Sequence, residues 1–321
     1  MALIPSGATW VRFPRYIGDA VMQMALLRLL RQAGIGPLVV WGPKLTVNLV
    51  TGTDLADATV PDVGKPSPWA MARLLREHKA ARSIHFPKSL RPALGAFLAR
   101  VPERMGVSES LAGLFNTHTG PFWSGTTGHC LDRYRAVLLK RWPDLPEVPF
   151  LDYHSSASPA LPHVPYVCLM PGASVPAKAW PVAHYRALAD LLHARGFLPV
   201  VLGGPAEREL GAEVAGAHGL NRCGDPLTEA AAWMRGARAA VGNDSGLSHL
   251  AAGCGTPTLA LYGPMDPGMF TPHGPQVAVL QRQDLECLPC GLDHCPVPGH
   301  PCLQGIGPER VMARIEGWLG A

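Results

Sequence analysis

Residues 242–252 read Gly242-Asn243-Asp244-Ser245-Gly246-Leu247-Ser248-His249-Leu250-Ala251-Ala252 and lie between two apolar runs, 239–241 and 258–263. The apolar runs predict strands, and the stretch between them predicts a polar loop followed by a short helix. Asp244 and Ser245 stand where an N-cap is expected, because their side chains can accept hydrogen bonds from the first helical turn. A helix that starts at the carboxyl end of a parallel strand also offers amide groups to a phosphate. The stretch therefore predicts either a ligand-binding loop or ordinary turn chemistry.

The composition is that of a globular protein. Of the 321 residues, 47% are hydrophobic and 16% charged, and the length is that of about two domains. The net charge of +4 is unevenly distributed: residues 1–155 hold 18 Lys and Arg against 11 Asp and Glu, and the remainder holds 10 against 13. The basic half favours an anionic partner such as phosphate, an acidic sugar or a membrane surface, although a solvated charged face would give the same count. The basic residues follow no nucleic-acid-binding pattern, so no nucleic acid is expected.

No basic start followed by an apolar run follows Met1, so a secretory signal is not expected. The longest uncharged stretch, 245–265, is interrupted by glycines and prolines and is not expected to span a membrane. We therefore expect a cytoplasmic protein.

The first half alternates strands and helices. Residues 9–13 predict a strand and residues 20–30 an amphipathic helix, so Gly18 and Asp19 lie in the first strand-to-helix turn. Asp19 is then either a helix cap or a carboxylate held at a ligand crevice. Further elements are expected at 38–41 (strand), 67–79 (helix), 81–86 (strand) and 90–99 (helix), with a polar loop over 116–130.

Prolines gather between residues 143 and 165 and predict a linker over 150–163. The second half then starts afresh, with a strand at 166–170, a helix opened by 178–181 and a strand at 197–202. The whole predicts an α/β fold of two doubly wound domains, 1–155 and 156–321. The last helix, 308–319, could belong to the second domain or pack back on the first.

Five motifs, in their order along the chain, resemble glycosyltransferase family 9, the ADP-heptose:lipopolysaccharide heptosyltransferases. Their residues are most similar to those of the heptosyltransferase II branch. They are residues 17–22, 85–89, 171–173, 178–181 and 243–264. The resemblance implies the GT-B architecture, two Rossmann-like domains with the active site in the interdomain cleft. It also implies an inverting, metal-independent transfer of heptose from ADP-heptose to the anionic inner core of lipopolysaccharide, at the inner face of the cytoplasmic membrane.

On the acceptor side, the resemblance makes Asp19 the general base that deprotonates the acceptor hydroxyl, and it places the acceptor at Gly18, Lys88 and Ser89. A carboxylate of ordinary basicity suffices for this role if it is well placed. The first domain would therefore bind the acceptor and the second the donor.

On the donor side, the resemblance implies that Asp244 binds hydroxyls of the donor sugar and that Glu207 binds the ribose. Adenine would lie near Leu227. Lys178 and Ser174 would bind phosphate, and the diphosphate or adjacent sugar would be bound by Ser245, Gly246 and His249. Lys178 and a helix amino terminus could neutralise the leaving diphosphate without a metal, so Lys178 also counts as catalytic. One departure bears on the donor: Ala179 stands where the family often has arginine.

Four of the eight cysteines form the set Cys287, Cys290, Cys295 and Cys302. Such spacing can indicate a structural zinc or iron–sulfur site, and the alternative is a reduced or disulfide-clipped surface loop. Cys168, Cys223 and Cys254 lie in apolar runs and are expected in the core, whereas Cys130 follows the polar segment and is expected to be exposed.

Two other functions fit the same fold. One is a transferase of the same family with another nucleotide-sugar donor, and the other is a sugar-nucleotide epimerase or binding protein without an acceptor.

Overall fold

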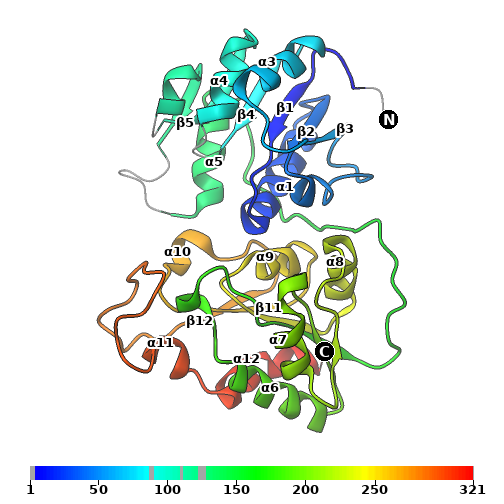
Figure 1. Cartoon of the computed structure of the whole chain (residues 1–321), viewed down its shortest axis with the longest axis vertical. Helices are drawn as coiled ribbons and strands as arrows, with labels where there is room; N and C mark the ends of the chain where they lie inside the picture. Colours follow the sequence, from blue (N-terminus) through cyan, green and yellow to red (C-terminus); the bar gives the residue numbers. More distant parts are fainter. Residues whose placement is uncertain (1–3, 87–89, 109–110, 122–127, 321) are drawn as a thin grey trace. The chain divides into compact units, whose positions relative to one another are not determined.

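The computed structural model describes residues 4–86, 90–108, 111–121 and 128–320. The chain divides into two compact units, Met1–Pro149 and Phe150–Ala321 (Figure 1). The division falls six residues before the expected boundary because residues 150–155 are anchored to the second unit. Phe150 packs against His273 with ring centroids 4.9 Å apart, and Tyr153 N donates to Gly253 O at 2.7 Å.

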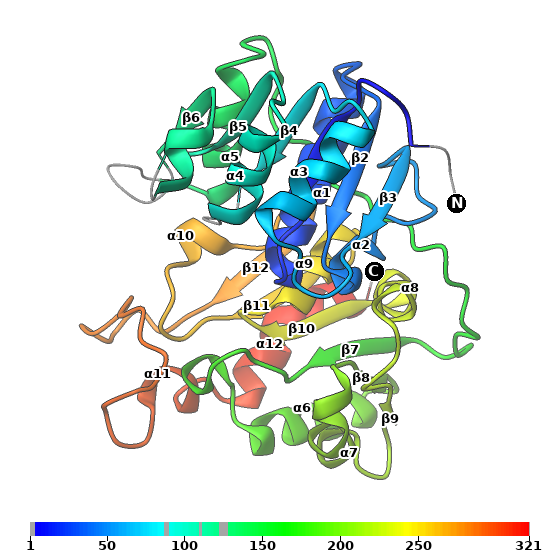
Figure 2. The same ribbon diagram turned by 45° about the horizontal axis from the view of Figure 1, so that its top comes forward.

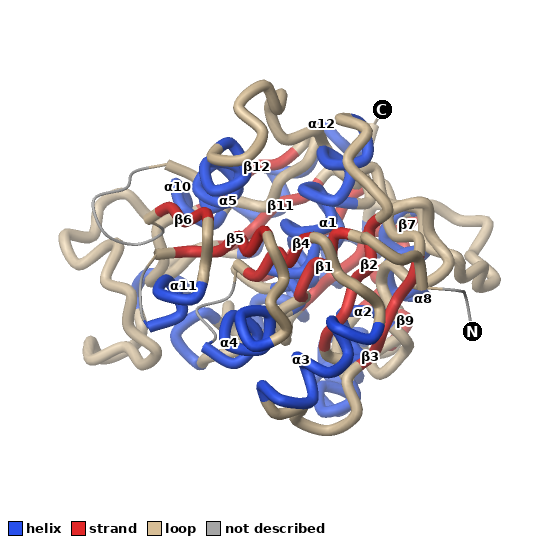
Figure 3. The backbone as a smooth tube through the Cα atoms, turned by 90° about the horizontal axis from the view of Figure 1, so that it is seen from above, coloured by secondary structure: helices blue, strands red, loops and turns tan. Residues whose placement is uncertain are grey.

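Unit 1 contains a six-stranded parallel sheet in the order β3-β2-β1-β4-β5-β6. Helices α1 and α5 lie on one face of this sheet, and α3 and α4 lie packed together on the other (Figure 3). The strands are β1 (Thr9–Arg12), β2 (Leu38–Gly42), β3 (Ala58–Pro61), β4 (Arg82–His85), β5 (Glu103–Val107) and β6 (His118–Gly120). The helices are α1 (Ile17–Gln32), α2 (Lys44–Val47), α3 (Pro68–Glu77), α4 (Leu90–Leu98), the 3₁₀ helix η1 (Leu111–Phe115) and α5 (Cys130–Leu139).

Unit 2 repeats the architecture with the strand order β12-β11-β10-β7-β8-β9, again all parallel. Its strands are β7 (Tyr166–Met170), β8 (Leu198–Val201), β9 (Leu220–Asn221), β10 (Ala239–Asn243), β11 (Thr258–Leu261) and β12 (Val277–Leu280). Its α-helices are α6 (Val182–Ala194), α7 (Arg208–Ala215), α8 (Leu227–Gly236), α9 (Gly246–Gly253), α10 (Pro267–Phe270), α11 (Pro301–Gln304) and α12 (Pro308–Leu319), and its 3₁₀ helices are η2 (Pro176–Lys178) and η3 (Pro205–Glu207). The predicted pair of doubly wound α/β units is confirmed.

The strand order reverses once in each sheet, and this decides where ligands can bind. In unit 1 the chain runs outward in opposite directions from β1 and β4, and in unit 2 from β7 and β10 (Figure 2). The exit loops of such neighbouring strands diverge, which leaves a crevice outside their carboxyl ends. The turn that carries Asp19 follows β1, and the stretch 242–252 spans the end of β10. Both sequence motifs therefore lie at switch points.

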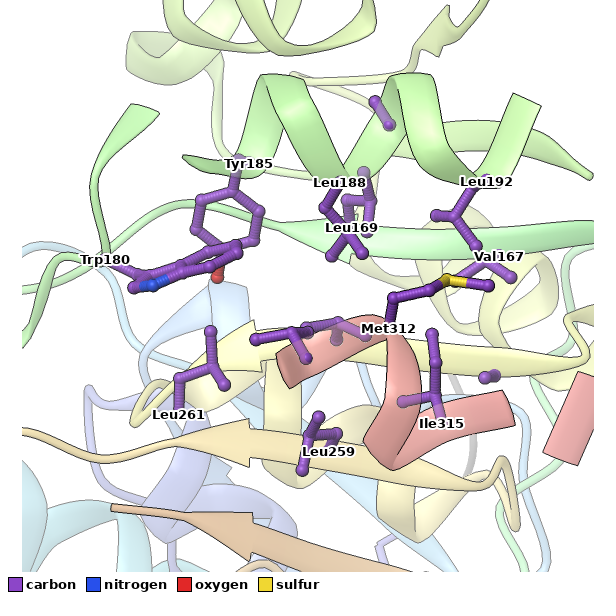
Figure 4. Packing of buried hydrophobic residues seen from close by; sticks show 14 of the residues in the cluster. Val167, Leu169, Trp180, Tyr185, Leu188, Leu192, Leu259, Leu261, Met312 and Ile315 are labelled. Atoms are coloured by element: carbon purple, nitrogen blue, oxygen red, sulfur yellow. The ribbon is translucent and has the colours of Figure 1, made fainter. Parts of the chain in front are cut away.

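The core of unit 2 explains why its strands are apolar along their whole length. Strand β7 is buried at every residue because helices cover both faces of the sheet. Leu188 and Leu192 of α6 and Met312 and Ile315 of α12 pack against the strands from one side (Figure 4). Helix α12 thus contributes to the core of unit 2.

Three local expectations differ from the structure. The segment 116–130, expected as a loop, contains β6, a three-residue edge strand too short to show a periodicity. The helix expected from Lys178 begins at Val182, because Pro176 to Lys178 form a separate 3₁₀ turn. Cys130, expected to be exposed, is fully buried at the start of α5 beside Met22.

Every helix within the described ranges is too short or too polar to cross a bilayer.

Candidate functional site

The switch point of unit 2 holds a partly buried ion pair. Lys178 Nζ lies 2.7 Å from Asp244 Oδ2, and the two side chains are 18% and 6% exposed. Lys178 comes from the loop after β7 and Asp244 from the loop after β10, so the pair bridges the two strands at which the sheet reverses. An ammonium group carries three donors, so the contact with Asp244 leaves donors for a second anion.

Asn243, the last residue of β10, fixes the geometry of that ion pair. Its Oδ1 accepts hydrogen bonds from Trp180 N at 3.0 Å and from Tyr185 Oη at 3.2 Å. Its Nδ2 donates to Pro171 O at 2.8 Å. One buried carboxamide therefore ties the exit loop of β7 to the start of α6, on either side of Lys178. No role for Asn243 follows from the sequence analysis above, although its position between the strand and Asp244 is a signal for one.

The amino terminus of α9 faces the same edge of the sheet. Ser245 is the N-cap residue, yet its side chain makes no capping hydrogen bond, and within the described residues its buried Oγ has no partner. The first amide groups of a helix have no intrahelical acceptor, so this end of α9 presents donors and a partial positive charge. The expected cap is thus absent: Asp244 pairs with Lys178, and Ser245 is left with hydrogen-bonding capacity for a ligand.

Glu207 borders the site from the β8 side. Its Oε2 accepts from Gly204 N at 2.5 Å, which anchors the carboxylate at the end of η3. A Cβ atom at Gly172 would overlap Glu207 Oε1, so glycine is needed where the β7 exit loop passes the carboxylate. Glu207 and the β7 exit loop are therefore in contact, as a shared ligand site requires.

The other residues predicted to bind the donor lie at the same edge of the sheet. His249 is buried one turn into α9, and Gly246 is the first residue of that helix. Ser174 is exposed in the β7 exit loop, and Leu227 opens α8 and is half-buried.

In unit 1, Gly18 and Asp19 lie in the first turn of α1, which begins just beyond β1. Asp19 lies near Cys130 and Tyr134 of α5. Burial, and secondly the charge of Asp19, raise the pKa of Cys130 to about 12 and the pKa of Tyr134 well above its usual value. The Tyr134 ring in turn packs on Phe86, 4.5 Å between centroids, at the end of β4. Asp19 is therefore a carboxylate beside neutral, largely buried groups at the unit 1 switch point. Lys88 and Ser89 lie outside the described residues.

His85 ends β4 and is buried. Its Nε2 lies 2.6 Å from the acceptor Asn116 Oδ1, to which it donates, and its Nδ1 lies 3.3 Å from Ser83 Oγ. Burial lowers the pKa of His85 to about 4.

The four clustered cysteines range from exposed (Cys287 and Cys290) through intermediate (Cys295) to buried (Cys302). Burial, followed by the proximity of Cys295 and Cys290, raises the pKa of Cys302, so these three thiols are neighbours. Across the part of the chain that the structure describes, however, no group of three or more His, Cys, Asp or Glu side chains has an arrangement that could hold a metal ion. Cys168, Cys223 and Cys254 are buried, as predicted.

Known proteins are similar to this chain in sequence and in fold. A family model described as glycosyltransferase family 9 (heptosyltransferase) matches residues 68–300. Lipopolysaccharide heptosyltransferase 2 of Escherichia coli K12 is 28% identical over 341 residues, which cover 95% of this chain and 97% of that protein. The solved structure of E. coli ADP-heptose lps heptosyltransferase II matches with a TM-score of 0.81 at 26% identity, over 97% of this chain and 98% of the other. A dodecameric iron-containing heptosyltransferase, TibC, shares only the fold, with a TM-score of 0.63 at 16% identity over 98% and 77% of the two chains.

The role of Asn243 can be measured by replacing it with alanine. Asn243→Ala leaves the buried Trp180 N–H and Pro171 C=O without partners, so we expect it to lower the free energy of unfolding by about 3 kcal/mol, at ~1–3 kcal/mol per unsatisfied group. Denaturant unfolding checks this, with the exposed Asn48→Ala as the matched control. A loss no larger than that of the control would contradict the role.

His85 makes the free energy of unfolding depend on pH, and the low pKa of the buried ring sets the direction of that dependence. The unfolded histidine takes up a proton near its ordinary pKa of ~6.5, whereas the buried ring does so only near pH 4. The buried His85 therefore does not lower the free energy of unfolding above pH ~6.5, and it lowers that free energy increasingly as the pH falls. Between pH 7 and pH 4 the wild type should lose about 3 kcal/mol more stability than His85→Gln, measured by denaturant unfolding at each pH. The exposed His163→Gln variant should lose stability with falling pH as the wild type does. Parallel curves of stability against pH for the wild type and His85→Gln would refute the lowered pKa of His85.

Proposed function

The chain belongs to glycosyltransferase family 9, and we propose that it transfers heptose from ADP-heptose to an anionic inner-core acceptor of lipopolysaccharide, with inversion at the anomeric carbon. It is a glycosyltransferase with the fold class of the GT-B heptosyltransferases. The observation that carries the proposal is the Lys178–Asp244 pair beside the open amino terminus of α9 at the unit 2 switch point.

We assign the donor to this site of unit 2. Lys178 and the first amides of α9 neutralise the diphosphate, assisted by Ser174, Gly246 and the free hydroxyl of Ser245. Asp244, which Lys178 holds in place, accepts hydrogen bonds from the sugar hydroxyls. His249 lies one turn further along α9, on the diphosphate or adjacent sugar. Glu207 takes the ribose and Leu227 packs against adenine.

We assign the acceptor to unit 1, where Asp19 is the general base and Gly18, Lys88 and Ser89 contact the acceptor. Gly18 carries no side chain, so an acceptor hydroxyl can approach the start of α1 closely. Tyr134, whose pKa is raised well above its usual value by burial and by the charge of Asp19, lies close to that carboxylate as a neutral group. The basic composition of this half of the chain suits an acceptor that carries carboxylates and phosphates.

In this mechanism, Asp19 removes the proton of the acceptor hydroxyl as its oxygen attacks the anomeric carbon from the face opposite the diphosphate. The bond to the diphosphate breaks through an oxocarbenium-like state, and ADP leaves as an anion that needs no general acid. Lys178 and the α9 amides stabilise the charge on the leaving group, which is the task a divalent metal performs in other transferases. We therefore propose that transfer proceeds without a metal, and that any metal held by the four cysteines is structural.

The acceptor of such an enzyme is anchored in the inner membrane, so we propose that the protein acts at the cytoplasmic face of that membrane as a peripheral enzyme. The identity of the donor is less firmly indicated than that of the acceptor. Ala179 adds no cation next to Lys178, where relatives often carry an arginine, and another nucleotide-sugar is therefore the principal alternative.

The proposed reaction is tested by ADP release from ADP-heptose with and without inner-core acceptor, in the presence and absence of a chelator. We expect release that depends on the acceptor and is insensitive to the chelator. Turnover of the donor alone would identify an epimerase or hydrolase, and turnover only of other nucleotide-sugars would reassign the donor.

Asp19→Ala should lower kcat by about 10²–10⁴-fold, the range for loss of a general base, with donor affinity little changed. Steady-state kinetics and calorimetric titration with ADP measure the two quantities. The exposed Asp54→Ala is the matched control in the same unit. Near-normal kcat in Asp19→Ala would reduce Asp19 to a helix cap.

Lys178→Ala should weaken ADP binding, because the diphosphate loses its cationic partner. The substitution also leaves Asp244 buried without a counter-charge, so its melting temperature must be compared with that of the wild type. Lys178→Arg keeps the charge and should retain more affinity than Lys178→Ala at similar stability. Unchanged affinity in a folded Lys178→Ala protein would remove Lys178 from the donor site.

A further inference from the structure

One face of unit 1 exposes a group of large apolar side chains. They come from α3, α4 and η1, neighbouring elements on the same side of the sheet, and we call them the apolar patch: Trp69, Leu90, Phe97, Leu111 and Leu114. Trp69 is 68% exposed and Leu114 is 77% exposed. Single exposed apolar residues are ordinary, but a group on adjoining elements marks an interaction surface.

The elements beneath the patch are fixed to one another. A Cβ at Gly95 would lie only 2.8 Å from Met71 Cβ, so α3 and α4 pack at the closest approach that glycine allows. Phe97 stacks edge-on against Phe115 of η1, 5.3 Å between centroids. Arg104 Nε donates to Phe115 O at 2.6 Å, and this hydrogen bond ties η1 to strand β5. The patch is therefore a preformed surface.

The same segment is strongly basic. Residues 68–115 contain eight Lys and Arg against three Glu. Glu77 pairs with Arg73 and Glu103 pairs with Arg82, and each pair also uses one of the cations, so the net formal charge of residues 68–115 is +5 (eight minus three). Arg91 and Arg100 are exposed on and just after α4, and neither forms an ion pair within the described residues.

Part of the patch lies at the edge of the sheet where Asp19 lies. Trp69, Leu90 and Leu111 each come at or near the start of the element that follows β3, β4 or β5. The carboxyl ends of parallel strands share one edge, so these three residues gather at the edge where the turn carrying Asp19 follows β1.

We propose that the apolar patch and its arginines dock unit 1 on a bilayer that contains anionic phospholipids. Apolar side chains enter the boundary between headgroups and acyl chains, while basic residues pair with lipid phosphates. A second copy of the chain fits less well, because two such faces would bring like charges together. The biological purpose rests on the proposed function: docking would bring the headgroup of a membrane-anchored acceptor to the edge that carries Asp19. The binding itself does not depend on activity.

The test is flotation of the full-length protein with phosphatidylcholine vesicles that contain or lack phosphatidylglycerol. The wild type should float only with the anionic vesicles, and less so in ~1 M salt, where the Debye length falls to ~3 Å. Arg91→Gln/Arg100→Gln should lower the partition coefficient by about thirtyfold. Leu111→Ser/Leu114→Ser should lower it by about tenfold or more.

Matched controls come from unit 2: Leu292→Ser/Val297→Ser for the apolar variant and Arg195→Gln/Arg314→Gln for the charge variant. These should bind vesicles as the wild type does. The proposal is overturned if the wild type fails to float, if neutral vesicles serve equally well, or if the control and patch variants behave alike. It is also overturned if light scattering shows a wild-type dimer that Leu111→Ser/Leu114→Ser converts to monomers while vesicle binding is unchanged.

Activity distinguishes this proposal from the proposed function. The patch variants should turn over a detergent-solubilised acceptor as the wild type does and lose activity only on acceptor embedded in anionic vesicles. A wild type that binds vesicles through the patch but releases no ADP with any acceptor would refute the transferase function and leave the docking surface standing.

Discussion

The geometry of the donor site depends on the hydrogen bonds of one buried carboxamide. Asn243 accepts from the backbone of Trp180 and donates to the backbone of Pro171, which fixes the path of the chain on both sides of Lys178. Its own backbone oxygen accepts from Ser248 Oγ at 2.6 Å, which positions α9 as well. The ion pair between Lys178 and Asp244 and the open end of α9 are therefore consequences of the same constraint, and none of them forms without the folded sheet.

The two units use the same architecture for different electrostatic tasks. At the switch point of unit 2, a cation and a helix amino terminus converge, which suits a diphosphate. At the switch point of unit 1, Asp19 stands beside neutral groups such as Tyr134, which suits proton abstraction from a hydroxyl. A doubly wound sheet supplies the location in both cases, and the exit-loop residues decide the chemistry.

Local pattern predicted the elements wherever burial was continuous or strictly periodic. Strand β7 and helix α1 were predicted within a few residues, because a strand covered on both faces must be apolar throughout and a surface helix must keep one apolar face. The same reasoning failed for β6, a three-residue edge strand, and for Cys130, whose polar sequence neighbours concealed its packing against Met22. Neighbours in sequence say little about burial when the covering residue lies more than a hundred positions away.

The sequence by itself determined the fold class, the family and the identity of the chemical groups, because strand periodicity, turn residues and motif order are local properties of the chain. Only the tertiary structure decided that Asp244 pairs with Lys178 instead of capping α9, that Asn243 holds the two exit loops, and that three helical elements share an apolar and basic face. These features join residues from separate strands and helices. Their contacts arise from strand order and packing, which no single segment encodes.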